Sequence, residues 1–216
     1  MHPSRVALTN KASDRLALLV TILMATAALA TSWAGYQASL WGSVQATHGN
    51  HASRLRTEST LASTRGGQQR LVDVQLFTSW LAAYAKNDTR LAAFYEQRFR
   101  PEFLLAFHAW LATRPMQSRN AAPSPFALPE YRLAEETKGQ RLAHAADEES
   151  AMSEHANGVN DGYVLDAIIL ATVMFFGTTA QLSAVTRMRG ILLGFALMTC
   201  VVGVVRLISA PLAWPS

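Results

Sequence analysis

Three long apolar runs constrain the fold of this 216-residue chain more than any other feature. Residues 16–33 contain no charged side chain, residues 163–182 contain only Asp166, and residues 191–214 contain only Arg206. About twenty apolar residues cross the hydrocarbon core of a bilayer as an α-helix. The sequence therefore predicts an all-α membrane protein. Its three transmembrane helices are expected at residues 16–34, 163–184 and 191–213.

The distribution of charge predicts how these helices are oriented. The net charge is +4, yet residues 34–163 carry thirteen Lys or Arg and thirteen Asp or Glu, so the surplus lies elsewhere. It is concentrated in residues 1–15 and at Arg187 and Arg189. Lys and Arg are enriched in cytoplasmic segments. We therefore expect a cytoplasmic tail (residues 1–15), a cytoplasmic link (residues 185–190), and an extracytoplasmic location for residues 35–162 and the C-terminus.

Aromatic side chains favour the same orientation. Trp33, Tyr36 and Trp41 follow the first apolar run, Tyr163 begins the second, and Trp214 ends the third. Amphipathic rings prefer the membrane–water interface. All five fall at the predicted outer interface. The neutral region between the first two spans gives no indication of nucleic-acid binding.

The first run also has an alternative interpretation as a cleaved signal peptide. Ala28-Leu29-Ala30 has the small-residue pattern of a cleavage site after Ala30. The run is long for a signal peptide, however, and a helical pattern continues past Trp33, which favours an uncleaved anchor. Both interpretations leave residues 35–162 outside the cytoplasm.

Residues 35–162 are expected to form a helical domain built on long extensions of spans one and two. The extensions, or arms, are residues 35–66 and 129–162, and a head comprises residues 68–113. Gly66-Gly67 is expected to interrupt the first arm, because each glycine costs about 1 kcal/mol relative to alanine in a helix. The arms contain little Leu or Ile, so we expect them to pair with arms of neighbouring chains or of a partner.

Within the head, turn and cap residues predict short helices. Asp88 is a good N-cap for a helix over residues 89–99, and Pro101 fits the first turn of a helix that ends near Thr113. Residues 114–128 contain three prolines and are expected to form a loop. The residues expected to fall on one face of the preceding helix are Val72, Leu76, Trp80 and Tyr84.

Two groups of charged residues are candidate sites. Asp166 and Arg206 both lie within apolar runs, where an unpaired charge is costly, so we expect an intramembrane ion pair. The second group mixes charge with aromatic rings and is either a partner-binding surface or a helix corner held by internal ion pairs. Its members are Tyr95, Glu96, Arg98, Arg100 and Glu102.

Histidine and cysteine give little indication of a metal site. His48 and His51 could share a helix face, but no third ligand is evident nearby. His144 and His155 lie among acidic residues that are more typical of a solvated helix face. The single cysteine, Cys200, lies in an apolar run and is expected to pack as a small hydrophobic residue. We expect no cofactor and no metal.

Two segments resemble a family of uncharacterised bacterial membrane proteins with one N-terminal and two C-terminal spans. They are residues 88–103 (DTRLAAFYEQRFRPEF) and residues 124–133 (SPFALPEYRL). The resemblance covers nearly the whole chain and implies a bacterial inner-membrane location. It implies no activity, so no functional residue can be assigned from it.

The leading functional hypothesis is a non-enzymatic membrane protein that acts as a scaffold, accessory subunit or sensor input through its exterior domain. Its expected partners are the lipid bilayer and either a second copy or another envelope protein. The alternative is a homo-oligomeric channel or transporter component. The motif formed by Gly190 and Gly194 permits close approach of helices, either within one three-helix bundle or in a dimer or larger ring. The residues that could line such a pore are Thr172, Thr178, Thr179 and Gln181. An envelope enzyme is the least favoured class, with only Glu96, Glu102 and His108 as acid–base groups.

Overall fold

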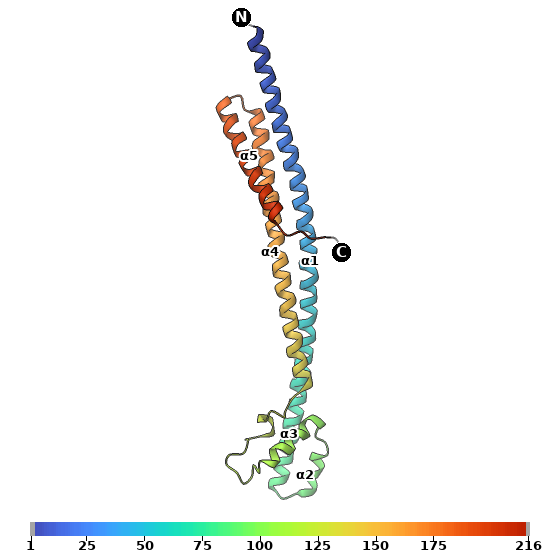
Figure 1. The fold of residues 1–216 in the computed structure, drawn as a ribbon. Coiled ribbons are helices and arrows are strands. Elements are labelled where there is room, and N and C mark those ends of the chain that lie inside the picture. Colours follow the sequence, from blue (N-terminus) through green and yellow to red (C-terminus); the bar gives the residue numbers. More distant parts are fainter. Residues whose placement is uncertain (1–2, 215–216) are drawn as a thin grey trace. The chain divides into compact units, whose positions relative to one another are not determined.

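The computed structural model describes the backbone of residues 3–214 and the side chains of residues 16–214. Helices are the only regular secondary structure of the described residues, with no strand among them (Figure 1). The helices are α1 (Pro3–Ala85), α2 (Thr89–Glu96), α3 (Pro101–Ala112), the 3-10 helix η1 (Pro125–Ala127), α4 (Ala134–Leu182) and α5 (Thr186–Ser209).

The predicted all-helical fold is confirmed. The structure also has three helices, α1, α4 and α5, that are long and apolar enough to cross a membrane. At about 1.5 Å per residue, the 24 residues of α5 extend about 36 Å, which exceeds the roughly 30 Å of a hydrocarbon core. The basic side chains of the expected cytoplasmic tail (Arg5, Lys11 and Arg15) lie outside the described side chains.

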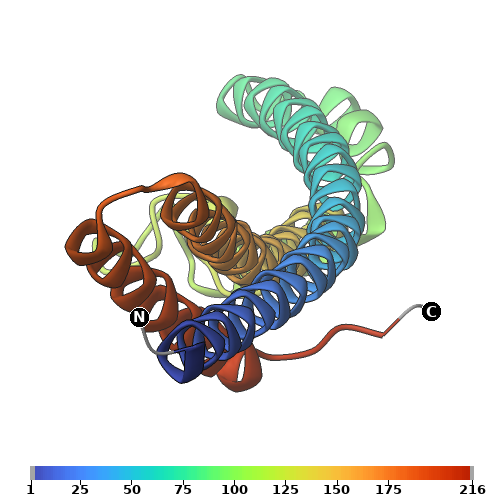
Figure 2. The same cartoon turned by 90° about the horizontal axis from the view of Figure 1, so that it is seen from above.

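The chain divides into two compact units, one formed by residues 1–49 and 150–216 and the other by residues 50–149. In the first unit, α1, α4 and α5 pack as a three-helix bundle, and Figure 1 and Figure 2 show the three helices next to one another. Its core contains Ala27 of α1, Val173 of α4, and Ala196 and Cys200 of α5. The packing role expected for Cys200 agrees with this position, since its side chain is buried.

Glycines bring the helices of this bundle close together, but at other positions than the sequence motif suggests. A Cβ atom at Gly203 would lie 2.8 Å from Leu170, and one at Gly177 would lie 3.1 Å from Met24. By contrast, a Cβ atom at Gly190 or Gly194 would meet nothing within 4 Å. The close approach of α5 to α4 therefore depends on Gly203.

Antiparallel pairing of α1 and α4 is mediated by small and polar residues in the first unit. Asn160 donates a hydrogen bond to the carbonyl of Ala38 at 2.5 Å, and Ser153 donates to the carbonyl of Gln45 at 3.0 Å. Side chains of one helix thus reach backbone carbonyls of the other. This reach is possible because the residues between the two backbones are small.

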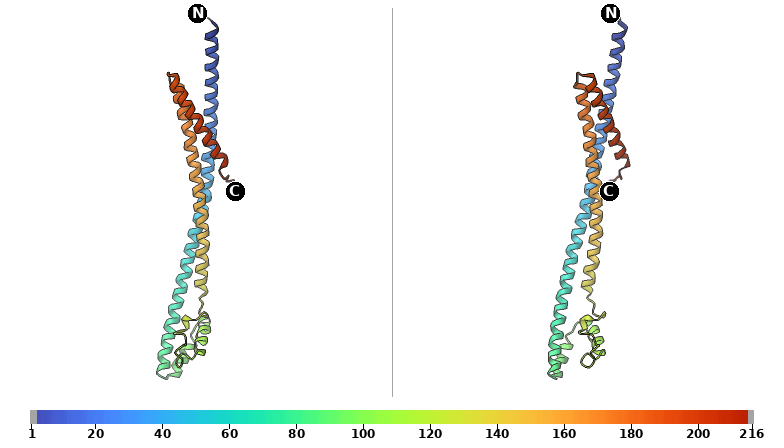
Figure 3. Two further views of the ribbon diagram at one scale, coloured as in Figure 1. Left: turned by 60° about the vertical axis from the view of Figure 1, so that its left-hand side comes forward. Right: turned by 90° about the vertical axis from the view of Figure 1, so that its left-hand side faces the viewer.

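The same two helices pair by the same means in the second unit (Figure 3). Ser59 donates a hydrogen bond to the carbonyl of Gly139 at 2.7 Å, and Ala52, Ala62 and Ala146 are buried. Polar contacts join the edges: His51 Nδ1 lies 3.0 Å from Glu149 Oε1, and Arg56 forms an ion pair with Asp147 at 3.4 Å. The arms therefore contact each other within one chain. Pairing with a neighbouring chain stays a prediction.

The predicted interruption at Gly66-Gly67 is wrong, because α1 continues without a break to Ala85. A Cβ atom at Gly66 would lie 3.2 Å from the backbone nitrogen of Glu136, so this glycine allows α4 to approach closely. Packing against α4 offsets the intrinsic helix penalty of glycine.

The start of α4 also differs from the prediction. Residues 129–133 are not helical, and α4 begins at Ala134. In this segment the Tyr131 hydroxyl bonds to Asp73, and Leu133 is buried. These two contacts hold the segment in a non-helical path before α4 begins.

The caps of the short helices follow the sequence rules. Asp88 Oδ1 accepts a hydrogen bond from the backbone nitrogen of Leu91 at 2.9 Å, which confirms the predicted N-cap, and Pro101 begins α3. However, α2 ends at Glu96 instead of Phe99. Phe99 turns into the core, and Arg100 adopts an extended conformation before the proline.

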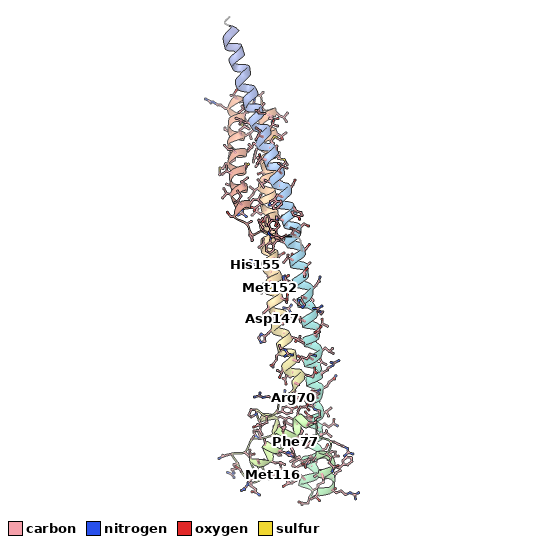
Figure 4. All side chains as sticks on the ribbon, turned by 45° about the vertical axis from the view of Figure 1, so that its right-hand side comes forward. Arg70, Phe77, Met116, Asp147, Met152 and His155 are labelled. Atoms are coloured by element: carbon pink, nitrogen blue, oxygen red, sulfur yellow. The ribbon has the colours of Figure 1, made fainter. Side chains whose placement is uncertain are left out.

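An aromatic cluster forms the core of the second unit. Phe77, labelled in Figure 4, contacts the rings of Phe103, Phe107 and Trp110 of α3 edge-to-face, at centroid distances of 5.2 to 6.4 Å. Such geometry stabilises aromatic pairs beyond their buried area.

The buried face of α1 in this unit is different from the apolar face predicted. Val72 and Tyr84 are about half exposed, whereas Asp73, Phe77 and Trp80 are buried. The buried spacing of four and then three residues still follows the helical period. The apolar pattern did not indicate this face because it excluded the carboxylate of Asp73.

Substitution of Gly139 by valine should test the close pairing of α1 and α4. A Cβ atom at position 139 would lie 2.5 Å from Ser63 Oγ and 3.2 Å from the carbonyl oxygen of Ser59. We expect Gly139→Val to lower the free energy of unfolding by about 1–3 kcal/mol, measured by thermal unfolding in detergent.

Gly67→Val is the matched control, because a Cβ atom at Gly67 meets nothing within 4 Å. This variant should be unchanged or up to about 1 kcal/mol more stable. Equal stability of the two variants would contradict the close-packing account.

Candidate functional site

Asp166 and Arg206 lie together between α4 and α5. Arg206 Nε donates a hydrogen bond to Asp166 Oδ1 at 2.5 Å. The residue Asp166 is only 2% exposed, while the side chain of Arg206 is 45% exposed. The structure thus brings together the two charged residues that the sequence places in apolar runs. The carboxylate is enclosed, and the guanidinium reaches the surface of the bundle.

Near this pair, polar side chains of α1 and α4 hold the segment that follows α5. The amide of Gln37 exchanges two hydrogen bonds with the backbone of Ala213, at 2.9 and 3.2 Å. Trp41 Nε1 and the Tyr163 hydroxyl both donate to the carbonyl of Pro211, at 3.1 and 3.0 Å. Figure 2 shows this segment passing beside α1. Aromatic residues expected at the outer interface therefore gather at one end of the bundle.

Removing one partner of the ion pair should destabilise the chain more than removing the charges of both partners. Arg206→Leu would leave the enclosed Asp166 carboxylate without its partner, and we expect a loss of about 3–5 kcal/mol in unfolding free energy. Asp166→Asn in that background should restore part of the loss. Thermal unfolding in detergent would measure both, and strictly additive losses would contradict a coupled pair.

A second enclosed carboxylate, Asp73, organises the head. It is 0% exposed and accepts hydrogen bonds from Arg100 Nε and Nη2, both at 3.1 Å, and from the Tyr131 hydroxyl at 3.0 Å. Arg100 immediately precedes α3, and Tyr131 lies just before α4. One carboxylate of α1 therefore fixes two distant segments of the chain.

This arrangement changes the acid–base properties of its donors. Burial is the main cause that raises the pKa of Tyr131 above its ordinary value, and the nearby charge of Asp73 adds to it. The hydrogen bond with Asp73 is the main cause that raises the pKa of Arg100. Both donors thus keep their protons more firmly in the folded chain.

Alkaline pH should therefore weaken the fold through Tyr131. Because its pKa is higher in the folded chain, its stabilising effect is complete below about pH 10, the ordinary tyrosine pKa. The effect is lost as the pH rises from there towards the folded-state pKa. Melting temperatures between about pH 8 and 11 should fall more steeply for the wild-type chain than for Tyr131→Phe.

The half-exposed Tyr84 provides the control for this measurement. Tyr84→Phe should keep the wild-type slope. Identical slopes for the wild-type chain and Tyr131→Phe would show that Asp73 and Tyr131 do not couple.

The predicted partner-binding group makes several contacts within the chain. Arg100 is bound to Asp73 and lies 3.9 Å from Glu102, and Glu96 lies 3.5 Å from His108. Arg98 stacks over the ring of Phe94 at 3.4 Å from its centroid. Tyr95 packs against the aromatic core. The corner between α2 and α3 is thus held by internal contacts, and Arg98 stays exposed.

His51, His108 and His155 each contact a neighbouring side chain. No cluster of three or more His, Cys, Asp or Glu suited to a metal ion occurs among the described residues. His155 packs edge-to-face on Trp41, and His108 is exposed beside Glu96. Glu102 lies 3.9 Å from Arg100.

The polar residues that could line a pore make hydrogen bonds mainly within their own helix. The hydroxyls of Thr172, Thr178 and Thr179 each donate to a carbonyl three or four residues earlier in α4. Gln181 contacts the sulfur of Met24 at 3.8 Å. These contacts satisfy the hydroxyl donors without a water-filled path.

Sequence reasoning missed Asp73 and Gln37. Asp73 lies between two valines, and the only signal was its spacing of four from Phe77 on the buried face. Gln37 lies just beyond the first apolar run and is 1% exposed, because both ends of its amide bond to Ala213. No local pattern in the sequence indicates that partner.

Comparison with known proteins gives no match, whether with protein-family models, curated proteins or solved structures. The resemblance to a family of bacterial three-span proteins therefore stays a prediction.

Proposed function

We propose that this chain is a non-enzymatic, multi-pass protein of the bacterial inner membrane that docks another envelope protein through its helical exterior region. In this proposal the N-terminus and the start of α5 lie in the cytoplasm, and residues 35–162 and the C-terminus lie outside. Arg187 and Arg189 at the start of α5 support this orientation. So do Trp41 and Tyr163, which lie together at the opposite end of the bundle.

The observation that carries the docking role is a hollow on α2. Its volume is about 510 Å³, and its walls include Arg90, Leu91 and Phe94. Phe94 is 47% exposed, whereas most other aromatic rings of this unit are enclosed. A hollow with an exposed aromatic side chain suits an apolar anchor of a partner.

The charges around this hollow indicate the chemistry of the partner. Asp88 is engaged as the N-cap of α2, and Glu96 is paired with His108. Arg90 lines the hollow, is exposed, and has no hydrogen-bond acceptor among the described residues. Arg90 is thus a cation at the rim that is free to bind a partner, and the proposed occupant is a segment of an envelope protein with an apolar side chain and an acidic one beside it.

Site-specific photo-crosslinking in native membranes tests this role. A photo-reactive residue at Phe94 should give one discrete adduct, and the same residue at Leu71, which is 70% exposed on α1, should not. Arg90→Glu should reduce the adduct roughly fivefold, because it reverses a charge at the rim. Arg119→Glu, an exposed arginine of the loop after α3, is the matched control and should have no effect.

Three outcomes would overturn the docking proposal. The first is an adduct at position 94 whose yield does not change in Arg90→Glu. The second is an equal yield of adduct from the photo-reactive residue at Leu71. The third is an adduct with twice the mass of the chain. The last would assign the surface to a second copy instead of another protein.

A further inference from the structure

A pocket of about 260 Å³ lies beside the Asp166–Arg206 pair. It lies between α4 and the end of α5, and Pro211 of the following segment closes one side. Its walls include Gly162, Tyr163, Asp166, Arg206 and Ser209. This volume far exceeds the roughly 30 Å³ that one water molecule occupies in the liquid, so a polar group of several heavy atoms fits.

The positive side of this pocket has unused donors. A guanidinium has five N–H donors, and Arg206 uses one of them on Asp166. Its terminal nitrogens have no acceptor among the described residues, although 45% of the side chain is exposed. Within a membrane such donors need an acceptor, because hydrocarbon supplies none. The planar arrangement of these N–H groups suits phosphate oxygens.

The negative side has an unused acceptor. Asp166 Oδ2 accepts no hydrogen bond among the described residues, since Arg206 binds only Oδ1. The other polar groups of the pocket are engaged, because the Tyr163 hydroxyl donates to Pro211 and Ser209 donates to Val205. The pocket thus presents one acidic and one basic group side by side. An anion alone would be repelled by Asp166, whereas a zwitterion can satisfy both groups.

From these observations we infer that the pocket binds the headgroup of a phospholipid that carries a primary ammonium beside its phosphodiester, as phosphatidylethanolamine does. The phosphate oxygens accept from the terminal nitrogens of Arg206, and the ammonium donates to Asp166 Oδ2. The lipid site requires α4 and α5 to span the membrane, and it is independent of the docking role proposed for α2.

Native mass spectrometry of the full chain in detergent tests the lipid site. Equal amounts of phosphatidylethanolamine, phosphatidylcholine and phosphatidylglycerol are added, and the retained lipid is counted. Phosphatidylethanolamine should be retained at least about tenfold better than the other two. Phosphatidylcholine has no N–H donor for Asp166, and phosphatidylglycerol has no cation. Equal retention of the three lipids by the wild-type chain would by itself overturn the proposal.

A pair of glycine variants locates the binding. Gly162 lines the pocket, and a Cβ atom there meets nothing within 4 Å, so Gly162→Leu should fill the pocket and keep the ion pair. Its retention of phosphatidylethanolamine should fall at least about tenfold. Gly158→Leu, an equally open position one turn away, should bind like the wild-type chain.

Unchanged retention in Gly162→Leu would overturn the assignment to this pocket. Soluble glycerophosphoethanolamine supplies the same headgroup without acyl chains. Failure of this compound to displace the lipid supports a lipid site, and full displacement at equal concentration would overturn it.

Discussion

Close approach of the α1 and α4 backbones is the constraint on which the rest of the structure depends. In both units the residues between these helices are mainly alanine, serine and glycine, and hydrogen bonds run from side chains of one helix to carbonyls of the other. Larger side chains would separate the backbones and break those bonds. The interface therefore derives little stability from burial of large apolar groups and much from the fit of small ones. Gly139, which has no room for a Cβ atom, illustrates that fit.

Enclosed carboxylates complement this backbone pairing. Asp73 and Asp166 are both nearly inaccessible, and each is bound by an arginine from another helix or its edge. An enclosed charge without such a partner is strongly destabilising. Each carboxylate therefore favours the packing of the helices in which its arginine is bound to it. In the head this selects the position of Arg100 before α3, and in the bundle it selects the position of α5 against α4.

Local sequence rules predicted the parts of the fold that depend on neighbouring residues. The apolar runs gave the three candidate spans, and Asp88 and Pro101 gave the starts of two helices. The same rules failed where a distant contact decides the outcome. Gly66 stays helical because Glu136 packs on it. Asp73 is enclosed by Arg100 and Tyr131, which lie 27 and 58 residues further along the chain. Of the candidate sites, the pair Asp166 and Arg206 could be proposed from sequence because charges in apolar runs are few. The pocket beside them could not, since it depends on where Pro211 lies.

The carbonyl of Pro211 has a further consequence for the bundle. It accepts from Trp41 and from Tyr163, so both of its lone pairs are occupied by donors from two different helices. Proline has no N–H of its own, so no competing donor arises at this junction. The end of α5 is thereby fastened to α1 and α4 together. Moving Pro211 away from either helix must break one of these bonds, so the segment after α5 resists displacement from both α1 and α4.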